Sequence, residues 1–96
     1  MSATTIHFVR HGKVYNPDHL LYERLPDFHL SDLGRRMAQA TAAYLANSPQ
    51  TNTISAVYSS PLDRTRETAD AILDALNPVR EARGEAPLML TADERV

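Results

Sequence analysis

The sequence predicts an α/β fold with parallel strands, and three patterns along the chain indicate it. Residues 5–12 have the composition of a buried strand, residues 31–47 carry apolar side chains at helical spacing, and residues 54–59 have the composition of a second strand. A strand, a crossover that contains a helix and another strand form a βαβ unit with parallel strands. The 96 residues suffice for one small domain with a single core.

The first predicted strand ends at an arginine, a histidine and a glycine. Ile6 and Phe8 are β-branched or aromatic residues, which fit a pleated, packed surface. Gly12 carries no Cβ, so the chain can turn sharply there. The strand would therefore deliver Arg10 and His11 to one edge of the sheet, which is where ligands bind in open α/β sheets.

A long irregular segment, residues 13–30, follows the first strand. Pro17 and Pro26 are turn formers, whereas Leu20, Tyr22 and Phe28 make the segment too apolar for a free linker. Segments of this length without secondary structure usually have a function. We expect this one to pack over the end of the first strand.

The first helix is predicted to begin after Ser31 and to stop at residues 47–49. Ser31 is a favourable N-cap, and the sequence Asn47-Ser48-Pro49 is a stop signal. Gly34 is costly in a helix interior, and a close approach of another backbone segment would explain it. The apolar spacing predicts a buried stripe that consists of Leu33, Met37, Ala40, Tyr44 and Leu45.

The second strand, residues 54–59, leads into a second predicted helix. Ser60 is a candidate N-cap, Pro61 suits the first helical position, and Asn77-Pro78 is expected to end the helix. A short third strand is predicted over residues 88–91. The buried face of the helix is predicted at six positions, which are Leu62, Thr65, Ala69, Ile72, Leu73 and Leu76.

Composition excludes several classes of function. The net charge is −2, so no basic face indicates a nucleic-acid partner. Without cysteine, the chain can form neither disulfides nor thiolate metal sites. No apolar run approaches the roughly 20 residues of a membrane span, and residues 1–5 do not resemble a signal peptide. We therefore expect a cytoplasmic protein that does not bind a membrane.

Arg10, His11 and Arg64 form the candidate site. The carboxyl ends of two parallel strands open on the same edge, and Arg64 lies in the first turn of the helix after the second strand. A guanidinium grips phosphate oxygens, a neutral imidazole is a nucleophile, and a helix N-terminus attracts anions. No carboxylate cluster or histidine pair at helical spacing lies nearby in the sequence, so no metal or other cofactor is expected. The pattern predicts a site for a phosphoryl group.

Three motifs occur in order over nearly the whole chain. They are Arg10-His11-Gly12, the segment Leu-Ser-Asp-Leu-Gly at residues 30–34, and Ser-Ser-Pro-Leu-Asp-Arg at residues 59–64 with Thr68-Ala69 after it. Together they resemble the histidine phosphatase superfamily, the phosphoglycerate mutase-like family. The resemblance implies a doubly wound, mostly parallel sheet with helices on both faces. Residues 1–96 would then be the N-terminal portion of a single domain of this kind.

The resemblance also implies roles for residues. His11 would attack phosphorus and become a phosphohistidine, Arg10 and Arg64 would hold the phosphoryl oxygens, and Gly12 and Asn16 would contact the substrate. The implied reaction is hydrolysis of a small phosphorylated metabolite. Phosphoryl transfer of the phosphoglycerate mutase type is the alternative among enzymes. The alternative outside enzymes is a catalytically inactive module that binds phosphate or another protein.

The sequence departs from the family pattern in four respects. Val14 stands where family members often have threonine, and Asn16 comes one residue earlier than the family's asparagine. The family's leaving-group acid usually follows the third strand, and Glu94 lies early for that role. The family's second pocket histidine normally comes from the C-terminal half of the domain. Besides a small phosphorylated substrate, we therefore expect association with that half, or a homo-oligomer.

Overall fold

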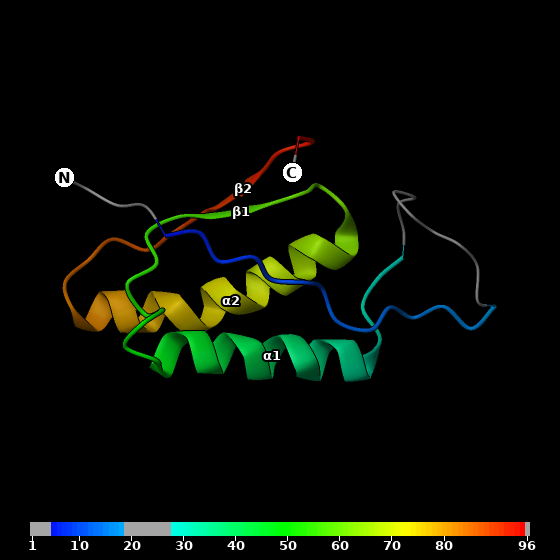
Figure 1. The fold of residues 1–96 in the computed structure, drawn as a ribbon, viewed down its shortest axis with the longest axis horizontal. Coiled ribbons are helices and arrows are strands. Elements are labelled where there is room, and N and C mark those ends of the chain that lie inside the picture. The colour runs from blue at the N-terminus through cyan, green and yellow to red at the C-terminus, as the bar shows by residue number, and fades with distance from the viewer. Residues whose placement is uncertain (1–4, 19–27, 96) are drawn as a thin grey trace.

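The computed structural model describes residues 5–18 and 28–95 and contains two helices and two short strands. In chain order these are α1 (Asp32–Asn47), β1 (Val57–Ser59), α2 (Asp63–Ala82) and β2 (Leu90–Ala92). Figure 1 shows the two strands side by side above the helix pair. β1 and β2 are parallel, with Val57 opposite Leu90 and Ser59 opposite Ala92. The predicted α/β class with parallel strands is therefore confirmed, and β1–α2–β2 is a βαβ unit.

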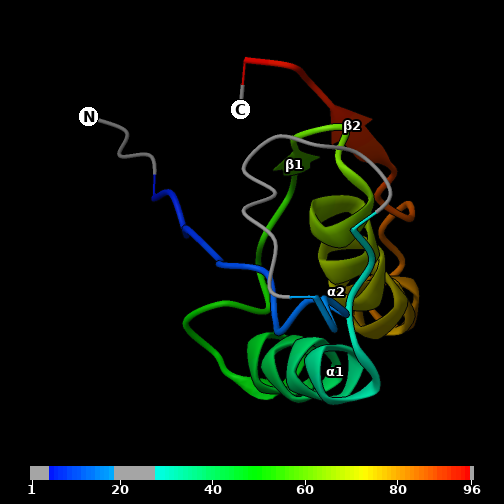
Figure 2. The ribbon, with the colours of Figure 1, turned by 90° about the vertical axis from the view of Figure 1, so that its right-hand side faces the viewer.

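The layers differ from the doubly wound sheet that the family resemblance implied. Within residues 5–18 and 28–95, the sheet has two strands, and α1 and α2 lie on the same side of it (Figure 2). α2 contacts both strands, whereas α1 packs against α2. The described part of the chain thus has one helical layer, not helices on both faces of a larger sheet.

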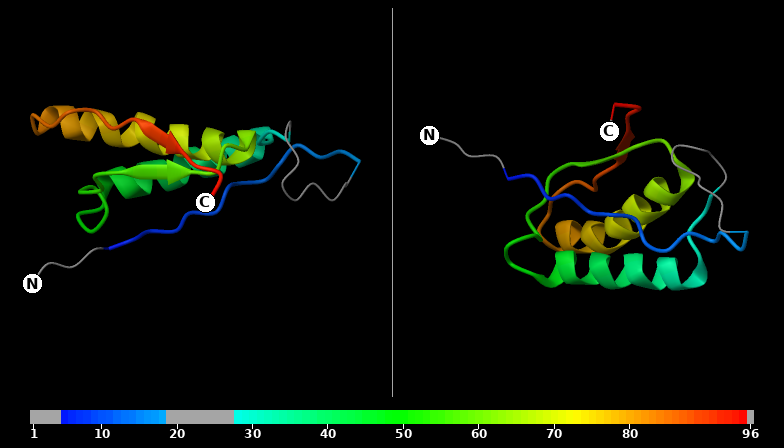
Figure 3. Two further views of the ribbon diagram at one scale, coloured as in Figure 1. Left: turned by 90° about the horizontal axis from the view of Figure 1, so that it is seen from above. Right: turned by 45° about the vertical axis from the view of Figure 1, so that its right-hand side comes forward.

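The predicted strand over residues 5–12 is wrong. This segment is extended but lies outside regular secondary structure, and the residues Ile6 and Phe8 are 67% and 92% exposed. Strand composition alone does not make a strand, because the ladder needs a neighbouring backbone. β1 pairs with β2, and the N-terminal segment runs along the other edge of β1, across a hollow (Figure 3).

α1 begins and ends where the sequence predicted. The Ser31 hydroxyl accepts a hydrogen bond from the Gly34 N–H at 3.0 Å, so Ser31 is the N-cap. The predicted stripe, however, is wrong except at Leu45, because Leu33, Met37 and Tyr44 are exposed. Small residues instead allow α1 to lie close against α2, since the distance between packed helices depends on the side chains at the contact. The buried positions are Gly34, Ala38, Ala42, Leu45 and Ala46.

The strands are shorter than predicted or displaced. β1 covers the last three residues of the predicted strand 54–59, because the Ile54 N–H donates instead to the Thr51 carbonyl in a turn. β2 starts two residues later than the predicted start at residue 88. The backbone of Leu88 is engaged elsewhere: both its N–H and its carbonyl bond to the side chain of Asn77, at 2.7 and 3.1 Å.

α2 begins later than predicted. Ser60 is not its cap; the N-cap is Leu62, which provides no side-chain hydrogen bond. The Ser60 hydroxyl lies 2.6 Å from the Thr65 hydroxyl, which donates to the Leu62 carbonyl at 2.8 Å. Residues 60–62 therefore form a separate turn between β1 and the helix.

α2 also continues past the predicted end at Asn77-Pro78. Pro78 lies inside the helix, where it removes a backbone hydrogen bond. Contacts after Pro78 offset this cost: Val79 packs on the core, and the Arg80 guanidinium bonds to the Ala86 carbonyl and pairs with Glu85. The predicted buried face is confirmed at Ala69, Ile72, Leu73 and Leu76, whereas Leu62 and Thr65 are only half-buried.

A glycine ends α2. Gly84 has φ +77°, in the left-handed region that favours glycine. The Glu85 N–H donates to the Arg80 carbonyl and the Gly84 N–H to the Glu81 carbonyl, which is the pattern of a Schellman motif.

Gly12 and Gly34 bring two backbone segments into direct contact. A Cβ at Gly12 would lie 2.6 Å from the Gly34 carbonyl oxygen, and a Cβ at Gly34 would collide with the Lys13 carbonyl. The close approach predicted at Gly34 is therefore confirmed. Nearby, the Lys13 carbonyl accepts bonds from the N–H and the hydroxyl of Ser31. These contacts hold the backbone of Gly12 and Lys13, which follow His11, against the first turn of α1.

We expect Gly34→Ala to destabilise the fold, even though alanine favours a helix by about 1 kcal/mol over glycine. The new Cβ would meet backbone atoms of Lys13, which cannot swing aside as a side chain can. Overpacking typically costs about 1–3 kcal/mol, so we expect a net loss of up to about 2 kcal/mol. The measurement is the free energy of unfolding in urea.

Gln39→Ala is the matched control, because Gln39 is exposed on the same helix. Its free energy of unfolding should change by less than about 0.5 kcal/mol. A Gly34→Ala chain as stable as the control would contradict the inference that the close contact at Gly34 stabilises the fold.

Candidate active site

His11 has a defined tautomer. Its Nδ1 lies 2.8 Å from the carbonyl oxygen of Gly12. A carbonyl oxygen only accepts hydrogen bonds, so Nδ1 must carry the proton when the ring is neutral. Nε2 then holds the free lone pair. The contact therefore prepares Nε2 as a nucleophile.

His11 lines two hollows. The smaller, of about 460 Å³, is also lined by Arg10, Gly12 and Asn16. The structure thus brings four of the five predicted site residues together. Lys13 and Met37 line the same hollow. Met37 was assigned to the core by its helical spacing, but it lies one turn after Gly34, and the contact between Gly34 and Gly12 brings that face of α1 toward His11.

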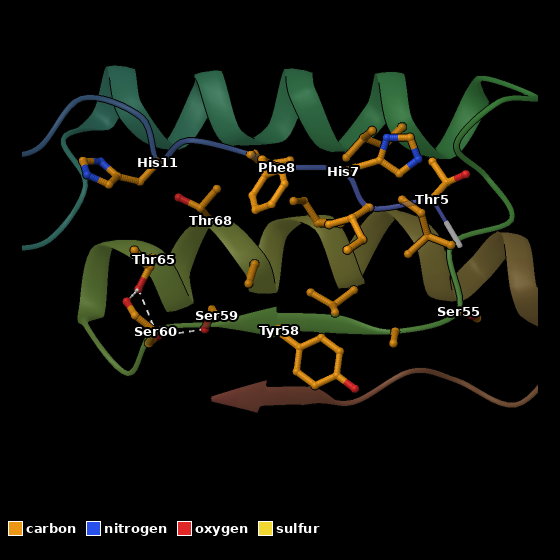
Figure 4. A pocket seen from close by; sticks show the side chains of 18 of the residues that line it. Thr5, His7, Phe8, His11, Ser55, Tyr58, Ser59, Ser60, Thr65 and Thr68 are labelled. Carbon is orange, nitrogen blue, oxygen red and sulfur yellow. Dashed lines mark hydrogen bonds between the residues drawn. The ribbon is translucent and has the colours of Figure 1, made fainter. Parts of the chain in front are cut away.

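The larger hollow, of about 780 Å³, lies between the N-terminal segment, β1 and α2. In Figure 4, His11 is at the same end of this hollow as Ser60, Thr65 and Thr68. The carboxyl end of β1 and the first turns of α2 therefore face the candidate nucleophile.

Arg64 is the fifth predicted residue and is placed differently. It lies in the first turn of α2 and is only 2% exposed. Among the described residues it lines neither hollow, although its neighbours Thr65 and Thr68 line the larger one. The structure thus places the backbone of Arg64 at the predicted end of β1 without bringing its side chain into a hollow with His11.

A group of hydroxyl side chains lies at this end of β1 and was not part of the predicted site. Ser59 and Ser60 are buried, and the Ser59 hydroxyl donates to the Ser60 carbonyl at 2.8 Å. Thr68 is buried as well, and its hydroxyl donates to the Arg64 carbonyl at 2.9 Å. Short polar residues occur on both sides of the turn between β1 and α2, and hydroxyls of this kind bond readily to nearby backbone groups. This pattern is the signal that could have predicted the group.

Glu67 connects the segment before α1 to α2. Its carboxylate accepts the Leu30 N–H at 3.1 Å, contacts His29 Nδ1 at 3.1 Å and pairs with the Arg35 guanidinium at 2.6 Å. Each exposed ion pair contributes little by itself, but one carboxylate here joins three groups. Glu67 therefore helps to hold residues 28–31, and through Ser31 the backbone of Lys13, against α2.

Two acidic residues follow β2. The Asp93 N–H donates to the Ser59 carbonyl at 2.8 Å, which continues the pairing of the strands. Hydrogen bonds from the Arg95 side chain, and then from the Arg95 backbone N–H, lower the pKa of the Asp93 carboxyl group. Asp93 is therefore ionised at neutral pH and is poorly suited to donate a proton. Glu94 is exposed beside it.

In the described ranges, no three histidine, aspartate or glutamate side chains form a group that could hold a metal ion. No helix within the same ranges is long and apolar enough to cross a membrane. The segment of residues 13–30 was predicted to pack over the end of the first strand. Its central part, residues 19–27, lies outside the described residues.

Comparisons with known proteins identify relatives but no close structure. Two proteins of Mycobacterium tuberculosis, the uncharacterized protein Rv0525 of strain H37Rv and the uncharacterized protein MT0547 of strain CDC 1551, are each 51% identical to the chain over 69 residues. The match covers 72% of this chain and 32% of each relative, so the chain spans about a third of their length. No solved structure matches the chain significantly.

A family comparison covers most of the chain. The family described as the histidine phosphatase superfamily (branch 1) matches residues 6–87. This range includes all three motifs on which the resemblance rested. The chain belongs to the histidine phosphatase superfamily.

Proposed function

We propose that this chain supplies the nucleophile and part of the phosphate pocket of an enzyme that hydrolyses a small phosphorylated metabolite. The hydrogen bond from His11 Nδ1 to the Gly12 carbonyl carries the proposal, because it leaves Nε2 free to attack phosphorus. Arg10 and Asn16 line the same hollow as this imidazole. Membership in the superfamily supports a reaction of this general type.

The proposed reaction has two displacements. His11 Nε2 attacks phosphorus, the bond from phosphorus to the leaving oxygen breaks, and a phosphohistidine forms. Water then attacks the same phosphorus and gives up a proton to the conjugate base of the acid that served the first step, and the bond from phosphorus to Nε2 breaks, which restores the lone pair of the imidazole. The leaving oxygen needs a proton in the first step, and the lowered pKa of Asp93 argues against that residue as its source.

Charge stabilisation is the main task of the other residues. Three phosphoryl oxygens spread negative charge in the transition state, and positioned cations and N–H groups stabilise it. Arg10 is exposed next to His11 and offers one guanidinium. We assign the second guanidinium to Arg64, because α2 begins at the end of β1 that faces His11. Gly12 lines the same hollow as His11 and would contact the phosphoryl group through its backbone.

A mutase-type reaction would share the first displacement and end with a hydroxyl group instead of water. Turnover in water enriched in oxygen-18 separates the two, because hydrolysis incorporates solvent oxygen into inorganic phosphate. Transfer to another hydroxyl leaves the phosphoryl oxygens unlabelled. We expect labelled phosphate.

His11→Ala should abolish formation of the phosphoenzyme, since the attacking nitrogen is lost. The assay incubates the chain with radiolabelled acetyl phosphate, whose leaving group departs without help from an acid. An alkaline quench preserves phosphohistidine, and acid then releases the label. The expected result is label on the wild type and none on His11→Ala.

His7→Ala is the matched control, because His7 is a second histidine that lines the larger hollow. It should keep the label. Equal labelling of the wild type and His11→Ala would refute the assignment of the nucleophile.

Arg64→Lys should slow phosphoenzyme formation by at least about 100-fold, in line with the loss of one positioned contact to the transition state. Lysine keeps the charge but loses the planar fork that binds two phosphoryl oxygens at once. The measurement is the initial rate of labelling by acetyl phosphate, after circular dichroism has shown that the variant is folded.

Arg66→Lys provides the comparison, since Arg66 is exposed two residues further along α2. Its rate should stay close to that of the wild type. If a folded Arg64→Lys chain also reacts at the wild-type rate, then Arg64 has a structural role in α2 only.

A further inference from the structure

The hollow that contains His11, Arg10 and Lys13 is larger than a phosphoryl group requires. Its volume of about 460 Å³ lies in the range of clefts that hold whole small ligands. In the proposed reaction, His11 and Arg10 engage the phosphoryl group that is transferred. Other residues that line the hollow are therefore available to contact the rest of the metabolite.

Positive charge dominates this hollow. Arg10 and Lys13 are exposed cations that line it, whereas no acidic side chain of the described residues does. The chain as a whole has a net charge of −2, so the positive charge is local. Such a cluster attracts ligands that carry negative charge.

Lys13 forms no ion pair within residues 5–18 and 28–95. It is the only lysine of the chain, and its ammonium group is a compact charge at the end of a flexible stem. The side chains that do pair with carboxylates in these ranges are His29, Arg35, Arg80, Arg83 and Arg95. The Lys13 ammonium group is thus available to an anion in the hollow.

The backbone of Lys13 is held in place next to the site. Its carbonyl accepts hydrogen bonds from the N–H and the hydroxyl of Ser31, at 2.8 and 2.9 Å. Val14, the next residue, forms an antiparallel bridge with Leu30. The attachment point of the Lys13 side chain is therefore fixed, which reduces what must be ordered when a ligand binds.

We propose that Lys13 is a specificity-determining residue that binds a second anionic group of the substrate. That group is a carboxylate or a second phosphate, since an ammonium group forms charge-assisted hydrogen bonds with either. The substrate class is then a small phosphorylated metabolite with a further negative group, and Met37, which lines the same hollow, contacts its carbon atoms. This inference rests on the proposed function, because it takes the phosphoryl group at His11 as its starting point.

The test measures the binding of three unreactive ligands to the 96-residue chain, namely phenylphosphonate, 4-carboxyphenylphosphonate and benzene-1,4-diphosphonate. The first has one anionic group, and the other two add a carboxylate or a second phosphonate on the opposite side of the ring. We expect the wild type to bind at least one of the latter two about fivefold more tightly than phenylphosphonate, which is the gain from one exposed ion pair. Which of the two binds more tightly distinguishes a phosphorylated acid from a bisphosphate.

Variants of Lys13 assign this preference to one side chain. Lys13→Met removes the charge and keeps a long side chain, so the preference should fall below about twofold, whereas Lys13→Arg should retain it. Arg36→Met is the matched control, because Arg36 is an exposed cation of α1 and is not among the described residues that line either hollow. It should keep the preference of the wild type. Circular dichroism checks each fold, and Lys13→Gln takes the place of Lys13→Met if that variant does not fold.

Three outcomes would overturn the proposal. The first is equal affinity of the wild type for all three ligands, and the second is a Lys13→Met chain that keeps the wild-type preference. The third is a Lys13→Met chain that binds all three ligands more weakly by the same factor, because Lys13 would then hold the transferred phosphoryl group. These phosphonates do not transfer a phosphoryl group, so the results do not depend on turnover. Failure of the proposed reaction would show instead as the absence of label from acetyl phosphate on the wild type.

Discussion

The contact between the backbones of Gly12 and Gly34 is the constraint on which the placement of His11 depends. A Cβ on either glycine would meet main-chain atoms of the other segment. Because α1 is itself held against α2 by the packing of Ala42, Leu45 and Ala46 with Ile72 and Leu76, the nucleophile is positioned by a pair of helices. The sheet plays a smaller part, since residues 5–10 form no strand among the described residues.

Hydrogen bonds around this contact extend its effect. The Lys13 carbonyl accepts hydrogen bonds from the backbone N–H and from the hydroxyl of Ser31, and the same hydroxyl caps α1. Glu67 then joins the neighbouring Leu30 to α2. A continuous series of contacts therefore runs from α2 through the cap of α1 to Lys13, two residues after His11. Its last step is the bond from His11 to the Gly12 carbonyl, which sets the tautomer. Structure and reactivity thus depend on the same few backbone atoms.

The features that could be predicted from the sequence are those that depend on the local chemistry of single residues. Ser31 was recognised as a cap and Gly34 as a close approach, because each follows from one residue's own geometry. The buried stripe of α1 was mispredicted because large apolar side chains were taken as the signal, whereas the core shared with α2 includes small residues such as Ala42 and Ala46. The predictions of a strand over residues 5–12 and of a helix end at Pro78 were wrong for a related reason. A strand needs a partner backbone, and Arg80, after the proline, bonds to the Ile54 carbonyl, which is distant in sequence.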